Sequence, residues 1–164
     1  MDIIEELLEN NRAYVAAHAP DHLATEPARR LTIVTCMDSR LDVLAALGLG
    51  IGDAHVLRNA GGVVSDDVIR SLAISQRKLG TRSVMLIHHT RCGMQLLTDD
   101  GFRAELEAET GVAPTFAIES FSDVDADVRQ SILRVRRSSF VPHRDDVRGF
   151  VYDVDTHALR EIVV

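Results

Sequence analysis

The sequence is poor in cysteine and has no long hydrophobic run. Its 164 residues include two cysteines, Cys36 and Cys92, and no tryptophan. Two cysteines cannot build a structural zinc site with three or four thiolates, and they are too far apart in sequence to form a Cys-x-x-Cys redox pair. No apolar run reaches the roughly 18 residues that a membrane-spanning helix needs. We therefore expect no membrane partner.

Positive charge is in the minority. The 18 lysine and arginine residues face 25 aspartate and glutamate residues, and the formal net charge is -7. Binding to nucleic acid needs a basic surface, so we expect no nucleic-acid partner. The opening segment MDIIEELLENNRAYVAAH is acidic and lacks the pattern of a signal peptide. We expect a cytoplasmic location, where stable disulfides are rare, so the two cysteines are metal ligands, reactive thiols or core residues.

The pattern of the chain is typical of one α/β domain over residues 1–164. The sequence is 46% hydrophobic, enough for a substantial core. Buried strands are predicted at residues 31–35, 54–57 and 83–87, and two short strands around residues 153–156. Helices are predicted at residues 2–17, 41–47, 66–79, 98–109 and 124–137. This alternation predicts a central, mostly parallel sheet flanked by helices in a three-layer-like arrangement, with an N-terminal helical arm at about residues 1–30.

Chemically active residues follow each of the first three predicted strands. Cys36 ends the first strand, residues 58–62 follow the second, and His89 and Cys92 follow the third. The carboxyl ends of parallel strands lie at one edge of a sheet, so we expect these residues to converge. A catalytic zinc site uses three protein ligands and leaves a fourth position open. Cys36, His89 and Cys92 would supply such a set.

The short spacing between His89 and Cys92 allows one tight turn to present both side chains. We expect Gly93 to ease the backbone there, and His88 to point to the opposite face of the strand. The alternative is that both cysteines are buried core thiols and His89 is a hydrogen-bonded core histidine. A phosphatase-like cysteine site would need an arginine six positions after Cys36, where the sequence has aspartate.

The segment CMDSR adds a carboxylate and a guanidinium group. Asp38 and Arg40 alternate in sequence, so both project to one side if the segment stays extended. A neighbouring arginine keeps a carboxylate ionised, and an ionised carboxylate can accept a hydrogen bond from a nucleophile. The alternative is an ordinary surface ion pair, worth roughly 0–1 kcal/mol.

Together, CMDSR, RNAGG and HHTRCGM resemble the motifs of the β-class carbonic anhydrases, which are Cys-x-Asp-x-Arg, Arg-Asn-Ala-Gly and His-x-x-Cys-Gly. The resemblance covers about residues 31–94, and the short chain is similar to the compact actinobacterial branch. It implies one Zn²⁺ per chain, bound by Cys36, His89 and Cys92. The implied reaction is the reversible hydration of carbon dioxide to bicarbonate and a proton.

The same resemblance implies further roles. Asp38 and Arg40 would be the catalytic dyad, and Gly61 and Gly62 would form part of the substrate pocket. The family forms homodimers, often paired into tetramers, in which the N-terminal helix embraces the partner subunit. Arg91 departs from the family pattern, where an acidic or small polar residue is common. The absence of tryptophan disfavours the second bicarbonate site that some members carry.

Other functions stay open on the sequence. Relatives of the family use the same zinc site to hydrolyse carbonyl sulfide or carbon disulfide, and the sequence does not separate these substrates from carbon dioxide. A non-catalytic zinc or thiol regulatory module would need the two cysteines but not Asp38. A metal-free α/β binding protein would need neither.

Overall fold

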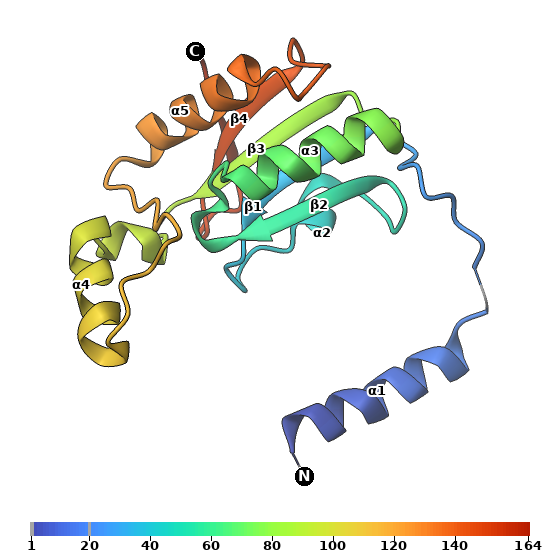
Figure 1. The fold of residues 1–164 in the computed structure, drawn as a ribbon. Helices are drawn as coiled ribbons and strands as arrows, with labels where there is room; N and C mark the ends of the chain where they lie inside the picture. The colour runs from blue at the N-terminus through green and yellow to red at the C-terminus, as the bar shows by residue number, and fades with distance from the viewer. Residues whose placement is uncertain (1, 20) are drawn as a thin grey trace.

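The computed structural model describes residues 2–19 and 21–164, which form a five-stranded sheet with flanking helices (Figure 1). The strand order is β2-β1-β3-β4-β5. The first four strands are parallel and β5 runs antiparallel to β4. The strands are β1 (Leu31–Cys36), β2 (Ala54–Asn59), β3 (Ser83–His89), β4 (Val147–Tyr152) and β5 (Leu159–Ile162). The predicted α/β class with a mostly parallel central sheet is confirmed.

The helices follow the predicted pattern closely. They are α1 (Ile3–Ala17), α2 (Val43–Leu47), α3 (Asp66–Lys78), α4 (Asp99–Thr110) and α5 (Val124–Arg137), with short 3₁₀ turns η1 (Ala60–Gly62) and η2 (Gly93–Leu96). The start of α3 shows how the sequence marks the beginning of a helix. The Ser65 side chain accepts a hydrogen bond from the Val68 backbone N–H, and two aspartates in the first turn face the positive end of the helix dipole.

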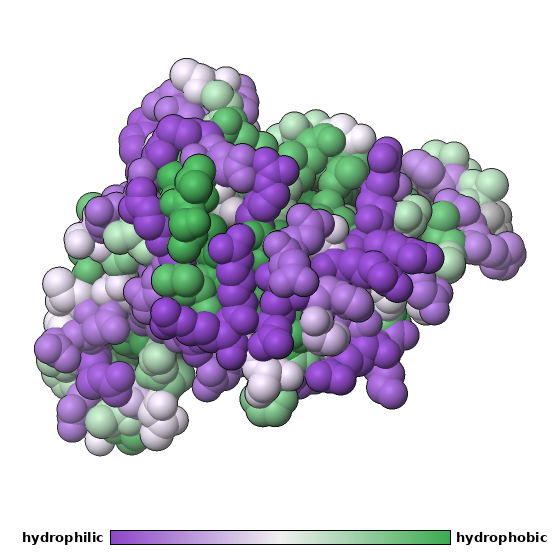
Figure 2. All heavy atoms as spheres, turned by 90° about the horizontal axis from the view of Figure 1, so that it is seen from above, coloured by the Kyte–Doolittle hydropathy of each residue, from purple (hydrophilic) through white to green (hydrophobic). Residues whose placement is uncertain are grey.

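The central strands are buried on both faces, which explains their continuous apolar sequences. Alternate residues enter two separate cores. Val34 and Leu86 belong to the core beneath α3 and α5, whereas Ile33 and Ile87 belong to the core on the side of α2. The face that carries α3 and α5 is mostly hydrophilic outside, with separated hydrophobic patches (Figure 2). The helices α3 and α5 thus bury apolar side chains against the sheet and expose mostly polar ones.

The N-terminal helix lies apart from the sheet (Figure 1). None of its residues is buried, and Ile3, Ile4, Leu7 and Leu8 are each more than half exposed. Exposed side chains at this helical spacing form an apolar stripe with no partner in the described part of the chain. No helix among the described residues is long and apolar enough to cross a membrane.

Candidate metal centre

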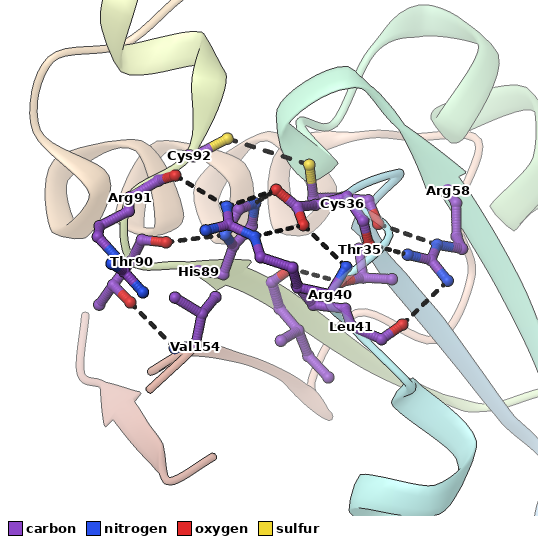
Figure 3. Close-up of polar contacts among 12 residues, drawn as sticks. Thr35, Cys36, Arg40, Leu41, Arg58, His89, Thr90, Arg91, Cys92 and Val154 are labelled. Atoms are coloured by element: carbon purple, nitrogen blue, oxygen red, sulfur yellow. Dashed lines mark hydrogen bonds and ion pairs between the residues drawn. The ribbon is translucent and has the colours of Figure 1, made fainter. Parts of the chain in front are cut away.

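Three buried side chains meet at the carboxyl edge of the sheet (Figure 3). Cys36 is the last residue of β1, His89 is the last residue of β3, and Cys92 lies three residues further on. Their candidate ligand atoms all lie within 4.8 Å of one another, and the two Sγ atoms are 4.0 Å apart. The parallel strands therefore bring together the three residues that the sequence marked as metal ligands.

The orientation of His89 fits metal binding. Its Nδ1 lies 2.9 Å from the backbone oxygen of Thr90. A carbonyl oxygen only accepts, so Nδ1 carries the hydrogen and Nε2 is left with a free electron pair. Nε2 is buried and has no hydrogen-bond partner among the described residues. A buried nitrogen without a partner is costly unless a ligand satisfies it.

The sulfur geometry fits zinc. Two thiolates bound to one tetrahedral zinc ion at about 2.3 Å lie about 3.8 Å apart, close to the 4.0 Å between the sulfurs of Cys36 and Cys92. The hydrogen bond from Cys92 lowers the pKa of Cys36 to about 4, against the opposing effect of burial. The same contact raises the pKa of Cys92, because its proton is held beside a thiolate. A cation that takes the place of this shared proton binds two thiolates.

Asp38 faces the same centre as a charged group. The Arg40 side chain donates to both carboxylate oxygens, from Nε at 2.8 Å and from Nη2 at 2.7 Å. These hydrogen bonds hold the pKa of Asp38 far below its usual range. The Oδ2 atom of Asp38 lies 3.7 Å from Nε2 of His89, so the carboxylate borders the three candidate ligands.

The Asp38–Arg40 pair forms in a different way from the one predicted. β1 ends at Cys36, and the segment after it is a turn, not an extended strand. The backbone N–H of Arg40 donates to Oδ1 of Asp38 at 3.0 Å, which closes the turn. Side-chain alternation along a strand is therefore not the reason that the two groups meet.

The turn that carries Cys92 depends on Arg91, and the expected role of Gly93 is wrong. Arg91 has a left-handed backbone with φ 54°, whereas Gly93 is not among the glycines with positive φ. The carbonyl oxygen of Arg91 accepts a hydrogen bond from Nη2 of Arg40 at 3.0 Å, which links the two loops of the centre. The Arg91 side chain is exposed and pairs with Asp155.

The glycines after β2 pack against the ligand-bearing strand. Gly62 has φ 72°, and a Cβ atom there would lie 2.8 Å from the backbone nitrogen of Cys36. Gly61 has φ 82°, and its Cβ would lie 3.1 Å from atoms of Met94 and Phe121. Close approach of the backbone thus requires glycine at position 62, whereas at position 61 the left-handed backbone favours glycine and the crowding comes from side chains. A role of Gly61 and Gly62 in a substrate pocket stays a prediction.

Two sets of contacts near the centre were not predicted. His88 is fully buried and points away from the ligands, as strand alternation requires, but its partner Asp127, at 2.6 Å from Nε2, is 39 positions away in sequence. Arg58 donates to the backbone of the loop that carries Cys36 and Asp38. Contacts of this kind join residues that no local spacing relates. The sequence signals for Arg58 were its position at a strand end and its place in the RNAGG motif.

A wide groove elsewhere on the surface is separate from this centre. It has a volume of about 820 Å³, lies between α3 and α5, and is lined by residues such as Ile69, Leu133 and Phe140. Its lining includes none of the three candidate ligands. The chemistry of the chain therefore points to the edge of the sheet and not to this groove.

Comparison with known proteins gives one consistent family. The model of the carbonic anhydrase family matches residues 31–159. The chain is 50% identical to β-carbonic anhydrase 1 of Mycobacterium tuberculosis over 162 residues, which covers 99% of both chains. It is 34% identical to the carbon disulfide hydrolase of Saccharolobus solfataricus, over 81% of this chain and 77% of the relative. The crystal structure of a carbonic anhydrase from Streptococcus mutans is similar with a TM-score of 0.93, 44% identity and 99% of each chain covered. The chain belongs to the β-carbonic anhydrase family.

Proposed function

We propose that this protein catalyses the reversible hydration of carbon dioxide to bicarbonate and a proton, with one zinc ion per chain held by Cys36, His89 and Cys92. The observation that carries the proposal is the buried cluster of two thiols and one imidazole beside an ionised Asp38. It occurs in a chain that is 50% identical to a mycobacterial β-carbonic anhydrase over nearly its full length. The cofactor of this family is zinc, and the donor set suits it.

The residues around the centre have separate roles in the proposed reaction. Zinc held by Cys36, His89 and Cys92 would lower the pKa of a water molecule and so make a nucleophile available near neutral pH. Asp38 is ionised and only accepts hydrogen bonds, so it orients the nucleophile toward the carbon atom of carbon dioxide. Arg40 holds the Asp38 carboxylate through two parallel hydrogen bonds, which fix its direction as well as its charge. The backbone N–H groups of Gly61 and Gly62 would form one wall of the substrate pocket.

The change Asp38→Asn tests this assignment. Asparagine keeps the size of the side chain but loses its charge, so we expect kcat/KM for carbon dioxide hydration to fall about 100-fold or more, as when one positioned hydrogen-bonding group is removed from an active site. Zinc content should not change. The measurement is stopped-flow hydration with metal analysis of the same sample. The matched control is Asp67→Asn, which removes the charge of an exposed Asp–Arg pair on α3 and should leave the rate unchanged.

The outcome of this test also separates catalysis from regulation. A non-catalytic zinc or thiol module needs the two cysteines but not the carboxylate. If Asp38→Asn retains the rate of the parent protein, or if the parent shows no hydration while carrying zinc, the catalytic proposal fails and the regulatory module is the better account.

Hydrolysis of carbon disulfide or carbonyl sulfide is the second candidate. It is favoured by the similarity to carbon disulfide hydrolases, including the one from Saccharolobus solfataricus at 34% identity. The higher identity to carbonic anhydrases favours carbon dioxide. Parallel assays of one preparation with carbon dioxide, carbonyl sulfide and carbon disulfide decide the matter. We expect kcat/KM to be highest for carbon dioxide, and a higher value for either sulfur compound would reverse the assignment.

We further propose that residues 1–164 form one domain whose N-terminal arm, about residues 1–30, packs on a second copy of the chain. The support is the exposed apolar stripe of α1. The assembly would be a homodimer or a dimer of dimers. We propose a cytoplasmic location because the two free thiols must stay reduced to bind a metal.

A further inference from the structure

Arg58 holds the loop that presents both Cys36 and Asp38. It is the penultimate residue of β2, and it pairs in register with Thr35 of β1. Its side chain donates to the backbone oxygen of Cys36 from Nε at 2.9 Å and to that of Asp38 from Nη2 at 2.6 Å. A third hydrogen bond runs from Nη1 to the backbone oxygen of Leu41 at 3.2 Å. One guanidinium group thus contacts three carbonyls of a single six-residue segment.

This segment has few other hydrogen bonds to the neighbouring strand. β1 ends at Cys36, and beyond it the ladder of the sheet gives one further bond, from the Met37 backbone N–H to the Asn59 oxygen at 2.8 Å. The Leu41 backbone N–H turns back to the Asp38 oxygen at 3.2 Å. Arg58 therefore provides most of the hydrogen bonds that tie residues 36–41 to the neighbouring strand.

Arg58 and Arg40 hold the loop differently. Arg40 contacts the Asp38 carboxylate and the carbonyl of Arg91, so it bridges the two loops of the centre. Arg58 contacts only backbone oxygens, and no carboxylate pairs with it among the described residues. In the view of Figure 3, Arg58 and Arg91 lie on opposite sides of Cys36. Arg58 thus acts on the direction of the backbone, whereas Arg40 acts on the carboxylate.

We propose that Arg58 is a positioning residue for the metal centre, fixing the backbone of residues 36–41 so that the Cys36 sulfur and the Asp38 carboxylate face His89. This inference rests on the proposed function, because it assumes that Cys36 ligates zinc. Arginine is needed because its planar group presents several donors in a fixed fork, whereas the single ammonium of lysine cannot reach three diverging carbonyls in the same way.

The test compares Arg58→Ala and Arg58→Lys with the parent protein. The main readout is the rate at which the zinc-loaded protein transfers its metal to a coloured chelator. Loss of a residue that orients a metal ligand typically costs about 10–100-fold in metal affinity or activity, so we expect Arg58→Ala to release zinc about 10–100 times faster. Arg58→Lys should fall between Arg58→Ala and the parent. Added guanidinium ion, at a concentration that leaves the parent folded, should slow release from Arg58→Ala.

A second readout reports the ligand geometry directly. In cobalt-substituted protein, we expect the visible absorption bands of Arg58→Ala to shift or weaken relative to the parent. The matched control is Arg103→Ala, which removes an arginine that also donates to two backbone oxygens, those of Pro114 and Phe116, away from the centre. It should leave both readouts unchanged.

The outcomes separate this inference from the proposed function. If Arg58→Ala releases zinc at the parent rate and keeps the parent cobalt spectrum, Arg58 has no positioning role. If Arg58→Ala does not fold, Arg58→Lys decides by the same two readouts. A parent that binds zinc but does not hydrate carbon dioxide overturns the proposed function alone, and a parent that binds no zinc overturns both.

Discussion

At the scale of single residues, the centre depends on close backbone packing beneath Cys36. Gly62 lies directly against that backbone, in a left-handed conformation with φ 72°. An added methyl group would meet the nitrogen of Cys36 and the carbonyl carbon of Thr35, at 2.8 and 2.9 Å. Backbone atoms cannot move aside as a flexible side chain does, so the ligand itself would be displaced.

We predict that Gly62→Ala lowers the free energy of unfolding by about 2–4 kcal/mol, from about 1 kcal/mol of backbone strain and about 1–3 kcal/mol of overpacking. It should also lower the zinc content. Gly111→Ala is the control, because Gly111 has a similar φ of 74° but open space around its Cβ position. This variant should lower the free energy of unfolding only by the backbone strain of about 1 kcal/mol. Urea unfolding and metal analysis measure both effects. Equal losses for the two variants would contradict the close contact at Gly62.

The sequence predicted the candidate ligands better than it predicted their supports. Cys36, His89 and Cys92 were identified by residue type and by their positions at strand ends, and the sheet brings them together. Arg58 and the left-handed Arg91 act through backbone carbonyls. The RNAGG motif marked Arg58 but not its partners, because backbone carbonyls are present at every residue and only the folded loop shows which of them it contacts.

At the scale of secondary structure, the ion pair between Arg160 of β5 and Asp125 of α5 joins the last strand to a helix. Two hydrogen bonds of 2.8 and 2.9 Å link the groups. The hydrogen bonds from Arg160 lower the pKa of Asp125, against the opposing effect of burial. A folded-state pKa below the unfolded value of about 3.9 means that the stabilisation is present above that value and lost as pH falls through the folded pKa.

We predict that Asp125→Asn lowers the free energy of unfolding by about 0.5–1 kcal/mol at pH 7, the range for a partly exposed pair. The difference from the parent should shrink as the pH falls below about 4. Asp100→Asn, in the first turn of α4, serves as control because Asp100 has no ion pair among the described residues. Urea unfolding from pH 7 to pH 3 measures the effect. A difference that does not change with pH would show that the pair contributes nothing through charge.

Helix and strand positions followed from local signals, but their ends and the turns did not. Residues 124–137 and 66–79 were predicted as helices from periodicity and capping, and α5 and α3 occupy 124–137 and 66–78. The second strand was predicted to end at Leu57 but continues to Asn59, because β1 pairs with Arg58 and Asn59. Pairing with a distant strand sets such an end, and the residues of the strand itself do not encode it.

At the scale of the whole molecule, α1 is the feature that supports the proposed partner subunit. It has no buried residue, and its apolar side chains share one face. An isolated amphipathic helix of 15 residues is marginal in water, so we expect packing on another surface to stabilise it. The proposed arm gives this face a partner in a second copy of the chain.

We predict that the double change Leu7→Glu and Leu8→Glu weakens self-association. Each buried leucine contributes about 1.5–3 kcal/mol, so the dissociation constant should rise at least about 100-fold. The control places two glutamates on the opposite face of α1, at Ala13 and Ala16. Sedimentation velocity should show the parent and the control as dimers or tetramers and the double variant as monomers. A parent that sediments as one chain would contradict the arm proposal.

The central claim is that two sulfurs and one imidazole nitrogen of this chain hold zinc. X-ray absorption at the zinc edge of the purified protein tests it most directly, because it counts the neighbours of the metal by element. We expect two sulfur atoms at about 2.3 Å and one imidazole nitrogen at about 2.0–2.1 Å, with one sulfur lost in Cys92→Ser. A zinc spectrum with only oxygen and nitrogen neighbours, or a protein that takes up no zinc, would contradict the account.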